Sequence, residues 1–299
     1  MIRPIAPGGR VVCLGDIMLD ISALLPGPLV HGSDTPAPIR FSHGGSAANT
    51  AAWLASLGVP CVFAGRVGAD SFGRDAVAAL RSHGVIPRVS TDPDAPTGVC
   101  LVLVGPDGER TMVPSAGANA TLDPADLGPD LLTAADHLHL SGYALLTEGS
   151  REAALVALRS AGEAGASVSV DAASAGPIRV VGPERFLGWL PPGTLLLANA
   201  DELAALTGTG DQDAGLAAVV ARGVDVVLKR GGLGSVLATA AGLWRSAAEP
   251  VEVLDSTGAG DAFAAGLLAA LRGGADPIRA LAEGNRWGAV AVGRLGGRP

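Results

Sequence analysis

The residues best suited to chemistry lie in one short string, Asp255-Ser256-Thr257-Gly258-Ala259-Gly260-Asp261, which runs into an apolar segment typical of a helix. Its small residues let successive backbone N–H groups converge at the start of that helix, where the helix dipole favours a phosphoryl group gathering negative charge. Asp261 is expected in the first turn, from which it could take a proton from an attacking hydroxyl, an effect typically worth ~10²–10⁴-fold in rate. Alone, Asp261 could equally be an ordinary helix cap. The whole string favours phosphoryl transfer.

Two common nucleotide-binding patterns are missing from the sequence. No Gly-x-x-x-x-Gly-Lys-Ser/Thr occurs, and no Gly-x-Gly-x-x-Gly follows the first predicted strand. These absences argue against the P-loop and the Rossmann dinucleotide folds, so a bound nucleotide must be held by another scheme.

Composition excludes several classes of partner. The net charge of −8 and the pI of about 5.1 leave no basic footprint, so we expect no nucleic-acid partner. No apolar run reaches the ~18 residues that a membrane span requires, and the first ten residues lack the apolar core of a signal peptide. We therefore expect a cytoplasmic protein with no membrane partner. The three cysteines match no zinc pattern and are expected to be buried and reduced.

Strands and helices alternate along most of the chain, which predicts an α/β fold with a doubly wound, mainly parallel sheet. The first strand is expected at 10–15, and a helix from Thr50 to Gly58 precedes a strand at 61–65 and a second helix at 72–83. Later strands are expected at 137–140, 167–171, 194–198 and 224–228, with a helix at 151–162 among them. No linker divides the 299 residues, so we expect one domain.

Two excursions from this alternation, at about 17–43 and 97–115, predict a small β-sheet lid. The first is rich in Pro and Gly and has no helical period, and the second is a hairpin whose turn signal is Asp107-Gly108. Exposed strand edges in such a lid make a homodimer through the lid a reasonable expectation.

The string at 255–261 resembles the second signature of the ribokinase, or PfkB, family of carbohydrate kinases, and Gly44-Gly45-Ser46-Ala47-Ala48-Asn49 with Val67–Gly73 resembles the first. Three further blocks follow in the family's order, at 117–122, 199–202 and 229–234. The resemblance covers essentially the whole chain. It implies a ribokinase-like kinase that transfers phosphoryl from ATP to a primary hydroxyl of a small sugar or sugar acid, such as ribose, fructose or 2-keto-3-deoxygluconate.

The resemblance also implies a role for each matched residue. Asp261 would be the base, and Gly258, Ala259 and Gly260 would form the anion hole for the transferred phosphoryl group. The acceptor would be bound by Asp20, Gly44, Gly45 and Asn49. A carboxylate suits a polyol, because each oxygen can accept from a separate hydroxyl.

The nucleotide would be bound by Asn199, Lys229, Gly231, Gly234 and Asn285, and Glu202 would act on Mg²⁺, through a water molecule if not directly. On the sequence alone, Asn199 and Glu202 could instead simply start a helix. Likewise, Lys229 could contact phosphate or be a solvated lysine at a strand end. A monovalent-cation site, for K⁺, is implied at Asp255, Thr257, Ala291, Arg294 and Gly296.

Three other functions remain open. The first is a nucleoside kinase on the same scaffold, which the ten aromatic residues of the chain disfavour. The second is a non-catalytic sugar-binding regulator, and the third is a kinase of a hydroxymethyl-pyrimidine-type vitamin precursor. Within the sugars, Ser141-Gly142-Tyr143 lacks the Glu with which ribokinase contacts ribose, whereas Gly117-Ala118-Asn119 is ribokinase-like.

Overall fold

A computed structural model describes residues 5–106 and 110–299. Nine strands form one large sheet in the order β13-β12-β11-β10-β9-β8-β1-β4-β5, in which all neighbours are parallel except at β12 and β13. Their bounds are β1 Val11–Leu14, β4 Cys61–Gly68, β5 Ile86–Asp92, β8 His137–Ser141, β9 Ser167–Asp171, β10 Leu195–Asn199, β11 Asp225–Lys229, β12 Ser235–Thr239 and β13 Gly242–Ser246. The predicted doubly wound, mainly parallel sheet is confirmed.

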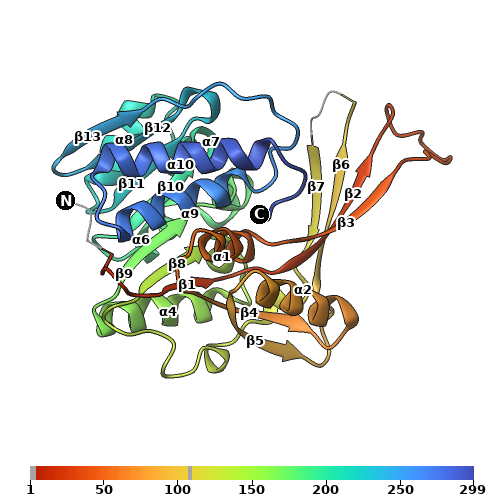
Figure 1. Ribbon diagram of the computed structural model, residues 1–299, viewed down its shortest axis with the longest axis horizontal. Coiled ribbons are helices and arrows are strands. Elements are labelled where there is room, and N and C mark those ends of the chain that lie inside the picture. Colours follow the sequence, from red (N-terminus) through yellow and green to blue (C-terminus); the bar gives the residue numbers. More distant parts are fainter. Residues whose placement is uncertain (1–4, 107–109) are drawn as a thin grey trace.

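The central strands are continuous apolar runs because helices cover both faces of the sheet. In β1, Val12 and Leu14 pack on one side and Val11 and Cys13 on the other. One face is covered by α3 Tyr143–Leu146, α4 Arg151–Ala164, α5 Ala175–Val181, α6 Pro183–Trp189, α7 Ala200–Thr207 and α8 Gln212–Val220. The other is covered by α1 Ser46–Ser56, α2 Ser71–Ser82, α9 Ala259–Arg272 and α10 Pro277–Val292 (Figure 1). Among the described residues, no helix is both long and apolar enough to cross a bilayer.

The order of the strands reverses between β1 and β8, since the chain proceeds from β1 to β4 and β5 on one side and from β8 to β11 on the other. In open α/β sheets, ligands bind outside the carboxyl ends of the strands at such a switch point. The functional site is therefore expected beyond Leu14 and Ser141, the last residues of these two strands.

The lid is a second sheet of four strands in the order β3-β2-β6-β7, and it stands apart from the large sheet in Figure 1. Its strands, β2 Met18–Leu24, β3 Ile39–Gly44, β6 Gly98–Val104 and β7 Arg110–Ser115, come from the two predicted excursions. The two excursions join through the parallel pair of β2 and β6. The predicted turn at Asp107-Gly108 lies outside the described residues.

The predicted start of the first helix was wrong: α1 begins at Ser46 rather than Thr50, so Asn49 lies inside its first turn. The cause is a cap supplied from a distant part of the chain. The carboxylate of Asp16 accepts hydrogen bonds from the backbone N–H groups of Ser46 and Ala47, at 2.8 and 3.4 Å. Such a cap is invisible to a local reading of the sequence.

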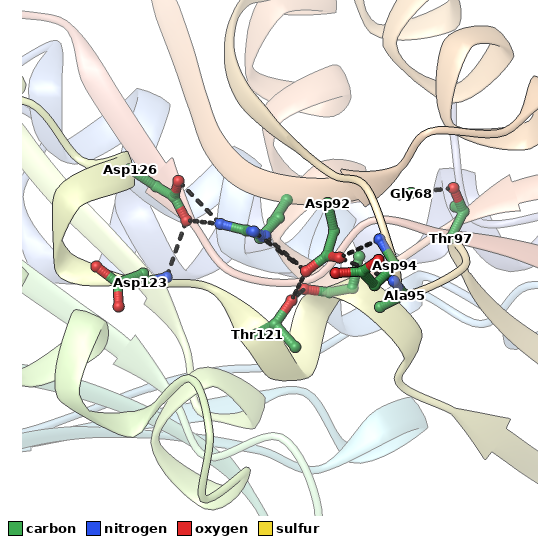
Figure 2. A network of polar contacts seen from close by, with 10 residues as sticks. Gly68, Asp92, Asp94, Ala95, Thr97, Thr121, Asp123 and Asp126 are labelled. Atoms are coloured by element: carbon green, nitrogen blue, oxygen red, sulfur yellow. Dashed lines mark hydrogen bonds and ion pairs between the residues drawn. The ribbon is translucent and has the colours of Figure 1, made fainter.

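A polar network fixes the segment that joins the lid to β8 (Figure 2). Arg66 of β4 bonds both Asp92, at the end of β5, and Asp126 in the 3₁₀ turn η2 Pro124–Asp126. Asp92 also accepts a hydrogen bond from Thr121, the last residue of η1 Gly117–Thr121. This network holds η1 against the large sheet, and η1 carries Asn119, whose side chain bonds both backbone polar groups of Ile17 at the base of the lid.

The core also contains the cysteines and two histidines. All three cysteines are free and buried, as predicted. His137 and His139 are buried on β8, where each hydrogen-bonds Ser169 on the neighbouring strand. Trp53 of α1 is also part of the core and is 1% exposed.

Candidate active site

A cavity of about 510 Å³ opens at the predicted switch point, between the large sheet and the lid. Its floor is formed by residues that follow or end parallel strands: Asp16, Asp171, Asn199 and Lys229. One wall is the start of α9, with Gly258, Gly260 and Asp261. The roof is the inner face of the lid, with Met18, Asp20, Cys100, Val102, Met112 and Pro114.

Asp261 lies at this cavity, in the first turn of α9. The N-cap of this helix is Gly258, so the alternative interpretation of Asp261 as the N-cap was wrong. Its carboxylate instead faces α1: Oδ1 accepts from the hydroxyl of Ser46 at 2.8 Å, and Oδ2 accepts from Nδ2 of Asn49 at 3.0 Å. The base and the acceptor-binding residue proposed from the sequence are therefore in direct contact.

Burial raises the pKa of Asp261 to about 7, although the hydrogen bonds from Asn49 and Ser46 favour the ionised form. The nearby carboxylates of Asp171 and Asp16 raise it further. A carboxyl group with a pKa near the working pH is well matched to proton transfer, since it is ionised often enough and basic enough to accept a proton.

This pKa predicts an acid limb in the pH profile. A base must be ionised to act, so kcat/KM for the acceptor should fall as the pH drops below about 7, by about tenfold per pH unit. Below about pH 6 the slope should steepen, because burial also raises the pKa of Asp20 to about 6. Initial rates at saturating Mg·ATP between pH 5 and 9 measure the limb. A flat profile down to pH 5 would contradict the assignment of Asp261 as the base.

Gly258, at the start of α9, must be a glycine for two reasons. Gly258 has a φ of +73°, and a Cβ there would lie 2.5 Å from Cα of Gly297. A Cβ on Gly260 would lie 3.3 Å from Nζ of Lys229. The first-turn N–H groups of a helix have no partner within the helix, and Gly258 has no side chain to cap them. The N–H of Ala259 donates only a long hydrogen bond, at 3.3 Å, to the carbonyl of Ser256. The N–H groups at this helix start and the ammonium group of Lys229 fit a phosphoryl group at this place.

The acceptor side is formed by β2 and by the turn between β3 and α1. Asp20 is only 8% exposed and faces the cavity from β2. Gly44 lies directly against it, since a Cβ there would be 2.1 Å from Oδ2 of Asp20. Gly45 has a φ of +95°, and a Cβ would be 2.4 Å from the carbonyl oxygen of Asp16. Three of the four predicted acceptor residues, Asp20, Gly45 and Asn49, therefore line the cavity, and Gly44 packs behind Asp20.

Lys229 forms an ion pair with Asp171, with 2.6 Å between Nζ and Oδ2 and side-chain exposures of 15% and 9%. The interpretation of Lys229 as a solvated lysine was therefore wrong. Burial alone would lower the pKa of Lys229, but the attraction of Asp171 and Glu202 raises it above its ordinary value. Lys229 is thus a cation on the floor of the cavity.

Asn199 and Glu202 form a reciprocal capping box at the start of α7. The backbone N–H of Asn199 donates to Glu202 at 2.8 Å, and the backbone N–H of Glu202 donates to Oδ1 of Asn199 at 2.9 Å. Both residues also line the cavity. The helix-start interpretation is therefore confirmed, while a role toward Mg²⁺ stays a prediction. Burial raises the pKa of Glu202.

The other predicted nucleotide residues lie beyond Lys229, outside the cavity lining. Gly231 begins the 3₁₀ turn η3 Gly231–Leu233. A Cβ on Gly234 would be 2.1 Å from the carbonyl oxygen of Ser246. Asn285 on α10 donates to the carbonyls of Ser246 and Ala247, at 3.1 and 3.3 Å. Its amide therefore holds the segment that follows β13.

The predicted cation residues meet behind the anion hole. Asp255 accepts from the backbone N–H groups of Thr257 at 2.7 Å and Gly296 at 3.0 Å. The carbonyl of Ala291 at the end of α10 accepts from the N–H of Arg294. Arg110 of the lid also forms an ion pair with Asp255 at 2.6 Å, which joins the lid to this loop.

Sequence reasoning missed several residues of the site. Asp16 and Asp171 could have been found, because each follows or ends a buried parallel strand whose carboxyl end faces the switch point. Ser46 stood within a recognised block but was given no role. Arg110 and Arg298 carried no local signal, since their contacts depend on the folded lid and on the segment after α10.

A doubly wound sheet, a lid and a carboxylate beside an uncapped helix start define a kinase of small molecules. The family comparison agrees, because residues 9–299 match the model described as pfkB family carbohydrate kinase. The chain therefore belongs to the pfkB family of carbohydrate kinases, and it is a carbohydrate kinase.

Known proteins similar to the chain are kinases with different acceptors. An ATP-dependent ribose-1-phosphate kinase from Halopiger xanaduensis is 34% identical over 97% of this chain and 94% of the relative. The crystal structure of adenosine kinase from Sinorhizobium meliloti has a TM-score of 0.88 and 27% identity, covering 97% of this chain and 96% of that one. A Vibrio cholerae fructokinase with bound fructose, ADP and calcium has a TM-score of 0.79 and 26% identity, over 97% and 94%.

Proposed function

We propose that the protein transfers the γ-phosphoryl group of ATP to a primary hydroxyl of a sugar or sugar acid, of the ribose, fructose or 2-keto-3-deoxygluconate type. The observation that carries this proposal is the contact of Asp261 with Asn49 beside the uncapped start of α9. A carboxyl group with a pKa of about 7 lies at this cavity, where it would act as the base between the proposed acceptor side and the proposed phosphoryl side.

In this mechanism the acceptor is held beneath the lid by Asp20, Asn49 and the Gly44-Gly45 turn. Asp261 takes the proton of the attacking hydroxyl. The N–H groups of Gly258, Ala259 and Gly260 stabilise the negative charge that develops on the transferred phosphoryl group. Catalysis then depends on positioning and electrostatics rather than on a covalent intermediate.

On the nucleotide side, Lys229 is proposed to face the phosphates and Asn199, Gly231, Gly234 and Asn285 to frame the nucleotide. Mg²⁺ fits beside Glu202, a carboxylate whose ionised form a nearby cation would favour, and when bound it supplies charge neutralisation of the phosphates. Each carboxylate oxygen of Glu202 already accepts one hydrogen bond from Asn199, which suits contact with Mg²⁺ through water.

The test is an ATP-consumption screen over pentoses, hexoses, their phosphates, 2-keto-3-deoxy acids and nucleosides. We expect turnover with a sugar or sugar acid. Asp20→Ala should then weaken acceptor binding by about 1–3 kcal/mol, because a carboxylate that accepts hydroxyl hydrogen bonds is lost, and should leave ATP affinity unchanged. Turnover confined to nucleosides would favour the nucleoside kinase, and ligand binding without turnover would favour the regulator. An unchanged acceptor Kd would remove Asp20 from the site.

A monovalent-cation site for K⁺ is also proposed at Asp255, Thr257, Ala291, Arg294 and Gly296. The carboxylate of Asp255 has its pKa lowered despite burial, chiefly by the N–H of Gly296, so it is an anion at neutral pH. Arg110 already pairs with Asp255 and could neutralise it without a metal ion. Whether K⁺ binds here is therefore tested by replacing K⁺ with tetramethylammonium, which is too large for such a site. Unchanged activity in tetramethylammonium would exclude the site.

The outer face of the lid supports the proposed homodimer. Phe41, Ile21, Leu101 and Val113 lie in one row across the four strands. Phe41 is 66% exposed, Val113 53% and Leu101 45%. Analytical ultracentrifugation should show a dimer for the unsubstituted protein and a monomer for Phe41→Glu, because the new carboxylate would be buried in the interface. A monomer in both proteins would contradict the proposed homodimer. We also propose that residues 1–299 form a single kinase domain and that the protein acts in the cytoplasm.

A further inference from the structure

The segment Gly296–Arg298, which follows α10, is built into the acceptor side of the site. The indole N–H of Trp53 donates to the carbonyl of Gly297 at 3.0 Å. A Cβ on Gly297 would lie 2.5 Å from Nδ2 of Asn49, so this segment touches the residue that contacts the base. The chain is thus held between α1 and the anion hole.

Arg298 then makes two hydrogen bonds on the acceptor side. Its Nε donates to Oδ1 of Asn49 at 3.1 Å, and its Nη2 donates to the carbonyl of Gly44 at 2.9 Å. Gly44 is the residue packed directly against Asp20. One guanidinium group therefore ties together the two places from which the acceptor is held.

The contact with Asn49 determines which way its amide faces. A guanidinium group can only donate and an ionised carboxylate can only accept. Arg298 therefore requires Oδ1 of Asn49 on its side, which leaves Nδ2 to donate to Asp261. If the amide turned over, both contacts would be lost.

The charge of Arg298 also acts on this side of the cavity. The guanidinium group of Arg298 is a cation at neutral pH, and the carboxyl groups of Asp20 and Asp261 are the acidic groups that attract it. Its Nη1 is buried and has no hydrogen-bond partner within residues 5–106 and 110–299. Several charged groups interact with Asp261: Asp16 and Asp171 disfavour its ionised form, whereas Lys229 and Arg298, which it attracts, favour it. Two other titratable groups, Cys13 and Tyr143, also interact with Asp261, and burial raises the pKa of both, so they are neutral near pH 7.

We propose that Arg298 is a positioning residue of the phosphoryl-transfer site, which fixes the amide of Asn49 toward Asp261, holds the Gly44 turn against Asp20, and favours the ionised base by its charge. This inference rests on the proposed function. It assigns a role in acceptor binding and base ionisation to a segment that lies outside both signature blocks.

The experiment compares Arg298→Ala, Arg298→Lys and the exposed control Arg279→Ala in acceptor kinetics from pH 5 to 9. In Arg298→Ala, the acid limb of kcat/KM should move to higher pH by about one unit, because an opposite charge near the base is lost, and the acceptor KM should rise about tenfold. Arg298→Lys should restore the limb but not the KM, since it keeps the charge without the paired donors. Arg279→Ala should match the unsubstituted protein, and ATP KM should not change in any variant.

A merely structural role predicts equal loss at every pH and no rescue of the limb by Lys, and either result would overturn the proposal. An unmoved limb with an unchanged acceptor KM in Arg298→Ala would also overturn it. If the unsubstituted protein phosphorylates no acceptor, the proposed function fails instead. In that case a ¹³C NMR titration of the aspartate carboxyls still tests Arg298: the proposal requires the Asp261 titration to move up in Arg298→Ala and return in Arg298→Lys, and no movement refutes it. Should Arg298→Ala not fold, Arg298→Gln removes the charge in its place, with the same limb shift expected.

Discussion

Substitution of Asp261 by Asn is expected to lower kcat by ~10²–10⁴-fold while leaving the affinity for Mg·ATP close to that of the unsubstituted protein. The amide cannot take the proton of the acceptor hydroxyl, whereas the anion hole and the floor of the cavity are unchanged. Turnover with the acceptor identified in the screen and calorimetric titration with ATP measure the two effects. Activity within about tenfold of the unsubstituted protein would show that another group is the base.

The fold should survive this change, because its hydrogen bonds can be satisfied by an amide. The Oδ1 of an Asn at this position can accept from Asn49, whose own amide is held by Arg298. The new Nδ2 can donate to Ser46, since a hydroxyl group both donates and accepts. The loss of activity should therefore not arise from an unfolded protein.

The pH dependence of stability provides a control for the same variant. Because the folded pKa of Asp261 is about 7 and its ordinary value is 3.8, the stability that this carboxyl contributes is present in full below about pH 4 and is lost as the pH rises through 7. Asn has no such loss, so thermal unfolding at pH 8 should occur at an equal or higher temperature. Asp213→Asn, in the exposed first turn of α8, should change neither activity nor stability appreciably.

The large sheet was predictable because its central strands are apolar on both faces, which gives continuous runs such as Leu195–Ala198 that few other structures accommodate. The switch point follows from the same alternation. Carboxylates at the carboxyl ends of these strands, among them Asp171, were equally visible in the sequence. They could be assigned to the site from one rule, that the carboxyl ends of parallel strands meet at the edge of the sheet where ligands bind.

Contacts made across the fold were not predictable from local patterns. The start of α1 depends on Asp16, thirty residues before it, and the environment of Asp261 depends on Ser46 and Asn49, more than two hundred residues away. No periodicity or spacing encodes the position of Arg298 beside Asn49. Short motifs identify which residues gather at a site, whereas their hydrogen-bond partners and pKa values follow from packing.

The second large effect is expected at Lys229. Lys229→Met should destabilise the protein by about 3–5 kcal/mol, because it leaves the carboxylate of Asp171 buried without its ion-pair partner. It should also lower kcat by ~10²–10³-fold if Lys229 faces the transferred phosphoryl group, a loss comparable with that of an oxyanion-hole donor. Urea unfolding and acceptor kinetics measure the two effects separately.

A second variant separates stability from chemistry. In Asp171→Asn/Lys229→Met no buried charge of the pair is left unpaired, so most of the lost stability should return while turnover stays low. Recovery of turnover together with stability would show that Lys229 acts only as the partner of Asp171. The matched control is Arg222→Met, which removes an ion pair to Glu184 of the same 2.6 Å length but with side chains 39% and 77% exposed. Because water screens that pair, its loss should cost under about 1 kcal/mol. If Lys229→Met and Arg222→Met lowered the free energy of unfolding by similar amounts, burial would not govern the strength of the Lys229–Asp171 ion pair.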